Sequence, residues 1–101
     1  MRVQDAKIDS LGFDGYVDED GDGELRLDER EIVLSYMDED GHRVEYRGKN
    51  TRDGHFELRC PERGGHASLH GFQGGKILEG YWHEGGYRGM WRVRVDKKIE
   101  Y

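Results

Sequence analysis

Cysteine, proline and long apolar runs are scarce in this sequence of 101 residues, and each scarcity narrows the class of protein. The single cysteine, Cys60, excludes an internal disulfide framework and fits a reducing compartment, so we expect a cytoplasmic protein. No apolar run approaches the roughly 20 residues that a helix needs to cross a bilayer, and the first residues lack the apolar stretch of a secretory signal. We therefore expect no membrane association.

Apolar residues are also few, at 34% of the chain, which is below the usual share of about 45–50% in globular proteins. Such a composition raises the question of disorder. Aromatic residues nevertheless make up 11% of the chain and gather in its later part, as a small packed core requires. The length fits one domain and leaves no room for a second.

The formal net charge of −6 conceals a division of the chain. Residues 1–40 contain 14 acidic and 4 basic residues, a net charge of −10, whereas residues 41–101 contain 8 and 12, a net charge of +4. All five histidines lie in the second part. This asymmetry is typical either of an anion-binding face or of an acidic segment that folds against a basic one, and we favour the second interpretation.

Apolar and polar residues alternate with period two from residue 24 onward, which is the pattern of half-buried β-strands. The alternating stretches cover residues 24–28, 32–37, 43–47, 55–60, 66–70, 77–82 and 87–95, and a weaker one covers residues 11–17. Turn-forming pairs such as Asp40-Gly41 and Gly85-Gly86 separate the stretches at hairpin spacing. A helix remains an alternative only over residues 28–37.

Short strands joined by short turns predict antiparallel neighbours, and hence an all-β, up-and-down meander of seven or eight strands. Closure or near closure of the meander into a small β-barrel would remove the exposed sheet edges. We place this single β-barrel domain at residues 11–101 and expect residues 1–10 to be a flexible N-terminal segment. Within the interior, the candidate ligand contacts are Tyr46, Trp82 and Trp91.

This layout resembles the calycin-like small antiparallel barrels, the avidin and lipocalin architecture. The chain has neither the avidin biotin-site motif nor the lipocalin N-terminal Gly-x-Trp signature, so the resemblance implies a fold and no particular ligand. Residues 79–89, with the pattern E-G-x-W-x-x-G-x-x-x-G, resemble a single MORN-type hairpin. One copy cannot form a stacked array, and we interpret it as a barrel hairpin whose glycines allow close packing around a tryptophan.

Residues 18–29 resemble an EF-hand calcium loop at every defining position. The resemblance implies that calcium would be bound by Asp18, Asp20, Asp22, Glu29 and the main-chain carbonyl of Glu24. The preceding stretch lacks helical periodicity because Gly12 and Gly15 interrupt it, and no second complete loop follows. We therefore favour a solvated acidic turn and keep a calcium site as the alternative, with no other cofactor indicated.

The remaining reactive side chains match no catalytic motif. His66 and His70 would lie roughly 13 Å apart on one strand, so a zinc ion shared by Cys60, His83 and one of them would require proximity across strands. We favour exposed strand histidines and a buried, structural Cys60. The sequence contains no nucleophile elbow, P-loop, H-E-x-x-H motif or dinucleotide fingerprint, and we expect no enzyme.

Strand phase turns a set of basic residues outward, namely Arg43, Arg47, Arg59, Arg88, Arg92 and Arg94. With neighbouring aromatic residues they could bind nucleotides or nucleic acid, for instance on a five-stranded OB-type barrel. Interleaved Glu45, Glu57 and Glu79 favour an ordinary charged exterior instead. The same phase exposes the apolar residues Val33, Met37, Ile77, Tyr81 and Met90, which indicates contact with a protein partner or a homodimer.

These patterns predict first a non-enzymatic β-barrel binding or interaction module, whose small ligand enters the barrel mouth or whose protein partner docks on an apolar face. A calcium-binding module that uses residues 18–29 is the second prediction. A nucleotide or nucleic-acid binder that uses the basic C-terminal strands is the third. Calorimetry with Ca²⁺ and measurements of salt-dependent nucleotide binding would separate them.

Overall fold

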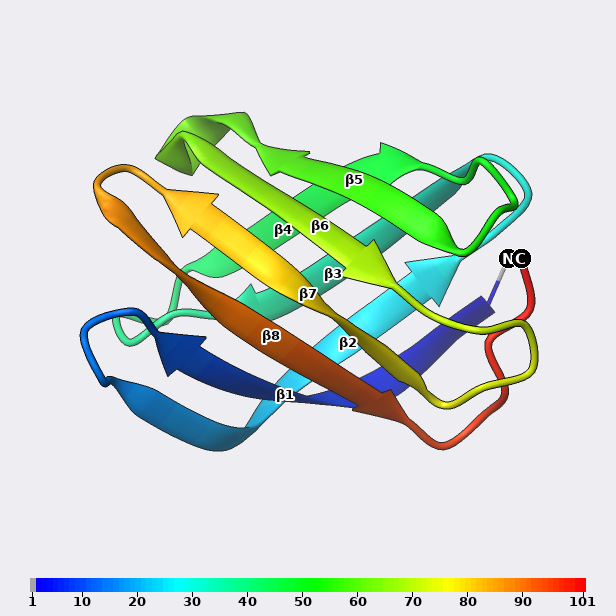
Figure 1. Ribbon diagram of the computed structural model, residues 1–101, viewed down its shortest axis with the longest axis horizontal. Coiled ribbons are helices and arrows are strands. Elements are labelled where there is room, and N and C mark those ends of the chain that lie inside the picture. The colour runs from blue at the N-terminus through cyan, green and yellow to red at the C-terminus, as the bar shows by residue number, and fades with distance from the viewer. Residues whose placement is uncertain (1) are drawn as a thin grey trace.

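The computed structural model describes residues 2–101, which form eight antiparallel strands closed into one barrel (Figure 1). The strands are β1 (Arg2–Gly12), β2 (Val17–Leu27), β3 (Glu31–Met37), β4 (Arg43–Lys49), β5 (His55–Cys60), β6 (Gly65–His70), β7 (Ile77–Glu84) and β8 (Tyr87–Val95), with one 3₁₀ turn, η1 (Pro61–Arg63). Each strand pairs with the next, and β8 pairs with β1. The predicted all-β meander and its closure are confirmed, and the alternative helix over 28–37 is replaced by β3.

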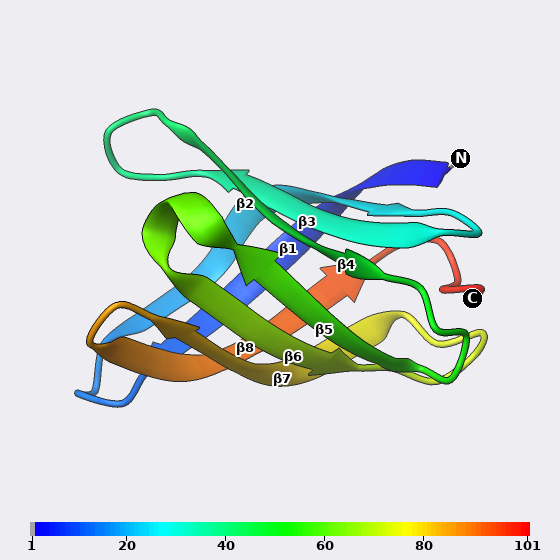
Figure 2. The same ribbon diagram turned by 90° about the horizontal axis from the view of Figure 1, so that it is seen from above.

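The meander gathers alternate connections at opposite ends of the barrel (Figures 1 and 2). The β1–β2, β3–β4, β5–β6 and β7–β8 connections lie at one end, which we call the mouth. Both chain ends lie at the opposite end, which we call the closed end. There, the Ile99 N–H donates to the Gly75 carbonyl at 2.7 Å, and the Ile99 carbonyl accepts from the Gly74 N–H at 2.7 Å. Ile99 is thereby buried, and the segment after β8 seals this end.

The N-terminal strand differs from the sequence-based prediction. The expectations of a flexible segment over residues 1–10 and of a strand over residues 11–17 are both wrong for the described residues, because β1 begins at residue 2 and the chain turns at residues 13–16. β1 pairs with β2 on one side and with β8 on the other. It contributes Ala6 and Ile8 to the core. Two alternating apolar residues are too few for the strand to be recognised from the sequence.

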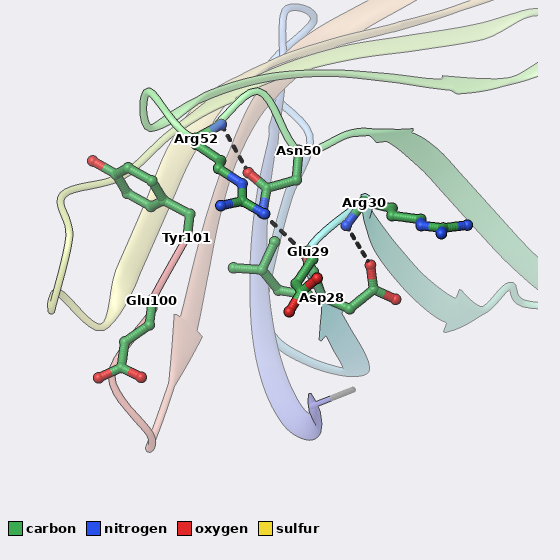
Figure 3. Close-up of a pocket in the computed structure, with 8 residues that line it drawn as sticks. Asp28, Glu29, Arg30, Asn50, Arg52, Glu100 and Tyr101 are labelled. Carbon is green, nitrogen blue, oxygen red and sulfur yellow. Dashed lines mark hydrogen bonds between the residues drawn. The ribbon is translucent and has the colours of Figure 1, made fainter.

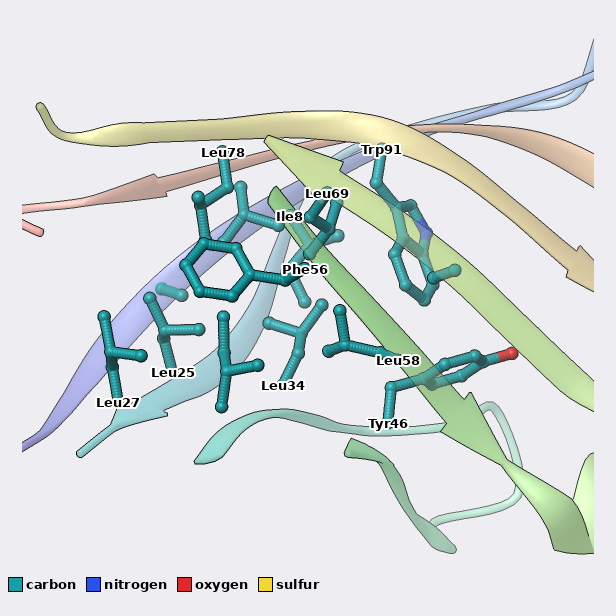
Figure 4. Packing of buried hydrophobic residues seen from close by; sticks show 14 of the residues in the cluster. Ile8, Leu25, Leu27, Leu34, Tyr46, Phe56, Leu58, Leu69, Leu78 and Trp91 are labelled. Carbon is teal, nitrogen blue, oxygen red and sulfur yellow. The ribbon is translucent and has the colours of Figure 1, made fainter. Parts of the chain in front are cut away.

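Inward-facing residues from all eight strands form the core (Figure 4). Its largest fully buried side chains include Leu34, Tyr46, Phe56 and Leu58. Phe56 lies edge-to-face with Tyr101 of the C-terminal segment, with ring centroids 6.0 Å apart, so the sealing segment packs on the barrel core. Full burial of one large apolar side chain contributes roughly 1.5–3 kcal/mol, and this interior is therefore the main source of stability.

The β7–β8 hairpin confirms the interpretation of residues 79–89 as part of the barrel wall. A Cβ atom on Gly89 would lie 2.8 Å from Cζ2 of Trp82, and one on Gly80 would lie 2.6 Å from the carbonyl carbon of Ser68 in β6. Real Cβ atoms do not approach other atoms so closely. Glycine at these two positions therefore permits the tight packing of a tryptophan and of two neighbouring strands.

Val33 corrects one prediction about the barrel exterior. It was expected to be exposed as a contact residue, but it is only 4% exposed although it does not belong to the interior core. Its neighbours across the two adjoining strands are Arg26 and Arg47, and both guanidinium groups contact Glu31. The alkyl parts of such arginines cover apolar surface while their charged ends stay in water. Val33 is therefore covered by ion-paired side chains and offers no docking surface.

Candidate ligand site at the barrel mouth

The mouth of the barrel holds a cavity of about 460 Å³, which we call the cup. Its floor includes Trp91, which is 5% exposed and has its ring centroid 6.1 Å from Tyr36, 5.0 Å from Tyr46 and 6.2 Å from Trp82. Small-molecule sites in proteins commonly measure about 300–1,000 Å³ and contain aromatic side chains. The cup therefore has the size and the floor of a small-molecule site.

The cup exists because small residues face inward at this end of the first two strands. Ser10 pairs with Trp91 and Gly21 pairs with Ile8, and both small residues line the cup. Farther along β2, Leu25 and Leu27 occupy the corresponding inward positions and are buried in the core. The interior is thus filled toward the closed end and left open at the mouth.

Exposed aromatic and apolar side chains surround the entrance of the cup. Tyr16 lies in the β1–β2 turn, Met37 ends β3, and Tyr87 begins β8; all three line the cup. Met37 is 60% exposed and Tyr87 is 72% exposed. An apolar rim of this kind can cover the body of a bound molecule and remove it from water.

The lining of the cup is strongly acidic. Its carboxylates are Asp18, Asp22, Asp38, Glu39, Asp40 and Glu84. The lining contains one basic residue, Arg63, which is supplied by η1. A ligand that enters the cup therefore meets an excess of negative charge beside aromatic rings.

Arg63 holds two of these carboxylates in place across the mouth. Its guanidinium group contacts Asp38 Oδ2 and lies 3.3 Å from Glu84 Oε1. The Tyr46 hydroxyl donates to Glu84 Oε2 at 2.5 Å. Burial, and then the bond to Glu84, raise the pKa of Tyr46. This network fixes Glu84 and connects β3, β4, β7 and η1 around the cup.

The other carboxylates give the mouth a negative potential. Lys7 contacts Asp22, but Asp18, Glu39 and Asp40 have no ion-pair partner among the side chains that the structure describes. Asp18 raises the pKa of Tyr16, with smaller contributions from burial and from Glu39. Since a nearby negative charge disfavours the tyrosinate, this shift is the effect expected of an unneutralised acidic rim.

The residues of the predicted calcium loop do not come together. Residues 17–27 form the extended strand β2, so Asp18 lines the cup whereas Glu29 lies at the closed end, roughly 30 Å away along the strand. Calcium ligands must all lie within about 2.6 Å of one ion. Asp20 instead contacts Arg94, and Asp22 contacts Lys7. The calcium-site alternative therefore has no supporting geometry, and the favoured interpretation of a solvated turn is also wrong, because residues 17–27 form a strand.

A second, more polar hollow of about 580 Å³ lies at the closed end, where Glu29 is found (Figure 3). Its polar groups bind one another: Asp28 Oδ1 accepts from the main-chain N–H of Arg30 at 2.8 Å, and Asn50 Nδ2 donates to the Asp28 carbonyl at 2.8 Å. The lining consists mainly of turn residues with mixed charges. This hollow separates two stabilised turns and lacks the aromatic floor of the cup.

A further acidic grouping also serves a turn. Potential ligand atoms of Asp38, Asp40 and His42 lie within 4.8 Å of one another. Asp38 Oδ1 already accepts from the main-chain N–H groups of Asp40 and His42, at 2.9 and 2.8 Å, and Oδ2 contacts Arg63. These bonds, led by the one from His42, lower the pKa of Asp38. The grouping is accounted for by stabilisation of the β3–β4 turn.

The six outward arginines fall into two separate groups. Arg43, Arg47 and Arg59 lie on β4 and β5, whereas Arg88, Arg92 and Arg94 lie on β8, with β6 and β7 between the groups. Acidic neighbours engage most of them: Arg43 with Glu24 and Glu45, Arg47 with Glu31, Arg92 with Glu79, and Arg94 with Asp9 and Asp20. Nucleic-acid binding, which needs a continuous basic surface, gains no support from this arrangement.

Four of the five predicted contact residues are exposed, namely Met37, Ile77, Tyr81 and Met90. Tyr81 and Met90 are cross-strand neighbours, and Leu11 and Val17, both exposed, continue this row across β1 and β2. Met37 and Ile77 lie elsewhere, at the mouth and at the start of β7. The homodimer or protein partner stays a prediction, which light scattering tests.

The zinc site considered from the sequence cannot form. His66 and His83 are cross-strand neighbours on the outer face, but Cys60 is 1% exposed and belongs to the interior core. A single ion cannot reach both faces of the sheet. Burial, and then the neighbouring Glu62, raise the pKa of the Cys60 thiol, as expected for a structural cysteine.

The sequence analysis, which treated one strand at a time, identified some residues of the cup and missed others. Trp82 and Trp91 were predicted as ligand contacts and line the cup, whereas Tyr46 is fully buried below it. Tyr36 and Glu84 were not singled out. Both occupy inward positions beside a turn that follows an odd-numbered strand, and such turns meet at one end of an up-and-down barrel. This positional signal would have found them.

Comparison of the chain with protein-family models, curated proteins and solved structures finds no match. Within residues 2–101, no helix has the length and apolar character needed to span a membrane. The function must therefore be inferred from the geometry and chemistry of the cup.

Proposed function

We propose that the chain is a non-enzymatic binding module whose cup takes a small organic cation with an apolar body. The observation that carries the proposal is the coincidence, in one cavity, of an aromatic floor and an excess of carboxylates. The layout of the barrel, which resembles the calycin-type architecture, supports a ligand that enters through the open end.

Cations are favoured over anions for a physical reason. An alkylammonium or guanidinium group above the face of a tryptophan or tyrosine gains about 0.5–2 kcal/mol. Unpaired carboxylates at the rim add attraction at the same place, whereas an anion would be repelled by Asp18, Glu39 and Asp40. Arg63 does not offset this charge, since Asp38 and Glu84 already engage it.

Binding is favoured over catalysis by what surrounds the only serine of the cup. Ser10 has neither a histidine nor a lysine beside it among the lining residues, so the cup lacks the serine–histidine and serine–lysine arrangements of nucleophilic catalysis. Glu84 is held in place by a hydrogen bond from Tyr46 and an ion pair with Arg63.

The two tryptophans of the chain both line the cup, so intrinsic fluorescence is a direct reporter of occupancy. Choline and benzyltrimethylammonium are titrated beside 3,3-dimethylbutanol, the uncharged counterpart of choline. We expect the two cations to change the fluorescence at lower concentration than the alcohol does. The variant Ser10→Phe should abolish the response, because its ring would occupy the cup.

Charge variants provide the matched comparison. Asp18→Asn should weaken cation binding about fivefold, as expected for the loss of roughly 1 kcal/mol of attraction near a solvated rim. Glu29→Gln makes the same change of charge at the closed end and should leave binding unchanged. Equal affinity for the alcohol would refute the choice of cations, and no response to any of the three probes would refute the cup as a ligand site.

A further inference from the structure

Four of the five histidines gather on the outer face of β5, β6 and β7, away from the cup. His55 pairs with His70 across β5 and β6, and His66 pairs with His83 across β6 and β7. Cross-strand partners on one face of a sheet place their side chains next to each other. The two pairs occupy equivalent positions, but only the first brings ring nitrogens together among the described residues.

The His55–His70 pair has the spacing of two ligands on one metal ion. The two Nδ1 atoms are 3.0 Å apart, and the ring centroids are 4.4 Å apart with the rings tilted by 54°. Two imidazole nitrogens bound at about 2.05 Å to a tetrahedral zinc ion lie roughly 3.4 Å apart. His55 is 46% exposed, and His70 is also exposed, so an ion from solution can reach both.

Glu57 prepares His55 for this role. Its Oε2 lies 3.2 Å from His55 Nε2, a position that favours a proton on Nε2 and leaves the lone pair of Nδ1 free to bind a metal. Carboxylate, histidine and metal in this order are the usual outer arrangement of histidine metal sites.

We propose that His55 and His70 bind a divalent transition-metal ion, such as Cu²⁺ or Zn²⁺, through their Nδ1 atoms. Imidazole ligands suit these ions and not Ca²⁺ or Mg²⁺, which prefer oxygen. Glu79 is the cross-strand neighbour of His70 on β7, but its Oε2 atom lies 2.6 Å from Arg92 Nε and is engaged in that ion pair. We therefore expect water molecules to supply the remaining ligands of the metal ion. The site lies on the outer wall, and its test is independent of the cup.

The test uses the untagged full chain and a Cu²⁺ titration followed by calorimetry in a non-coordinating buffer. We expect one ion per chain, and His55→Gln or His70→Gln should each weaken binding roughly 10- to 100-fold. Glu57→Gln should weaken it about tenfold. The matched control is His83→Gln, an exposed histidine on the neighbouring strand β7, which should leave the affinity within about twofold.

Electron paramagnetic resonance supplies a readout that a merely structural change would not produce. The Cu²⁺ spectrum of the parent chain should show coupling to two imidazole nitrogens, and that of His70→Gln should show one. Urea unfolding without metal verifies that each exposed-site variant remains folded. Unchanged affinity in both His55→Gln and His70→Gln, or an equal loss in His83→Gln, would overturn the proposal.

Discussion

The close approach of β6 and β7 at Gly80 predicts a large effect from a very small change, Gly80→Ala. Gly80 pairs with Leu69, and a Cβ atom built on it would overlap the Ser68 carbonyl oxygen, lie 2.6 Å from its carbon and lie 3.0 Å from the Leu69 Cα. Carbon atoms pack best at about 3.5–4.0 Å. The two strands must therefore separate by roughly 1 Å at this point, because all three obstructing atoms belong to the main chain.

The expected cost follows from what the separation disrupts. Two ladder hydrogen bonds weaken, each with a net contribution of about 1 kcal/mol, and overpacking adds roughly 1–3 kcal/mol. Alanine recovers less than about 1 kcal/mol by restricting the unfolded chain. We expect Gly80→Ala to lower the free energy of unfolding by about 3 kcal/mol, and the Tm by roughly 15 °C.

Gly86→Ala is the control, because a Cβ atom there has no heavy atom within 4 Å although it lies in the same hairpin. Urea unfolding at equilibrium and calorimetry measure both variants against the parent. Gly86→Ala should stay within about 0.5 kcal/mol of the parent. A value that small for Gly80→Ala, or an equal loss in both variants, would refute the reasoning from close strand contact.

Two further predictions concern the mouth. Burial, and then Glu84, raise the pKa of Tyr36 to about 12 from 10.0, so its protonated form is favoured by folding, and the stability it contributes below pH 10 is lost as the pH rises toward 12. Absorbance at 295 nm during a pH titration should show one tyrosine that ionises near pH 12, and the variant Tyr36→Phe should lack that step. If the step persists in the variant, the raised pKa does not belong to Tyr36. Arg63→Met should reduce stability by about 1 kcal/mol and tighten cation binding in the cup, because it frees Asp38 and Glu84. Tighter binding is measured by tryptophan fluorescence, and weaker binding would contradict the attribution of cation affinity to the acidic lining of the cup.

The strands between residues 24 and 95 could be predicted from the sequence because apolar and polar residues alternate there according to which face of the barrel wall they occupy. Inward positions such as Phe56 and Leu58 are apolar because they fill the interior, and their neighbours on β5 face water. The charge division was also informative: Arg43 contacts Glu24, and Arg94 contacts Asp9, so basic residues of the second part neutralise acidic residues of the first.

β1 and the first part of β2 were missed because most of their inward residues are small. Ser10, Gly21 and Gly23 carry no apolar signal, and the acidic residues between the glycines suggested a metal loop. Pairing of β1 with β8 sets Ser10 opposite Trp91, and pairing of β1 with β2 sets Gly21 opposite Ile8, so Ser10 and Gly21 lie at the mouth. The same small residues create the cup, so the site lies in the part of the chain where periodicity is weakest.

The sealed end of the barrel has a consequence for how this protein can be joined to other things. β1 begins and the chain ends at the closed end of the barrel (Figures 1 and 2). The cup is lined by residues of the mouth, at the other end. A fused domain, an affinity tag or a surface anchor at either terminus would leave the entrance unobstructed. For the proposed binding function, the barrel could thus be attached by its closed end, with Tyr16, Met37 and Tyr87 presented to the solution.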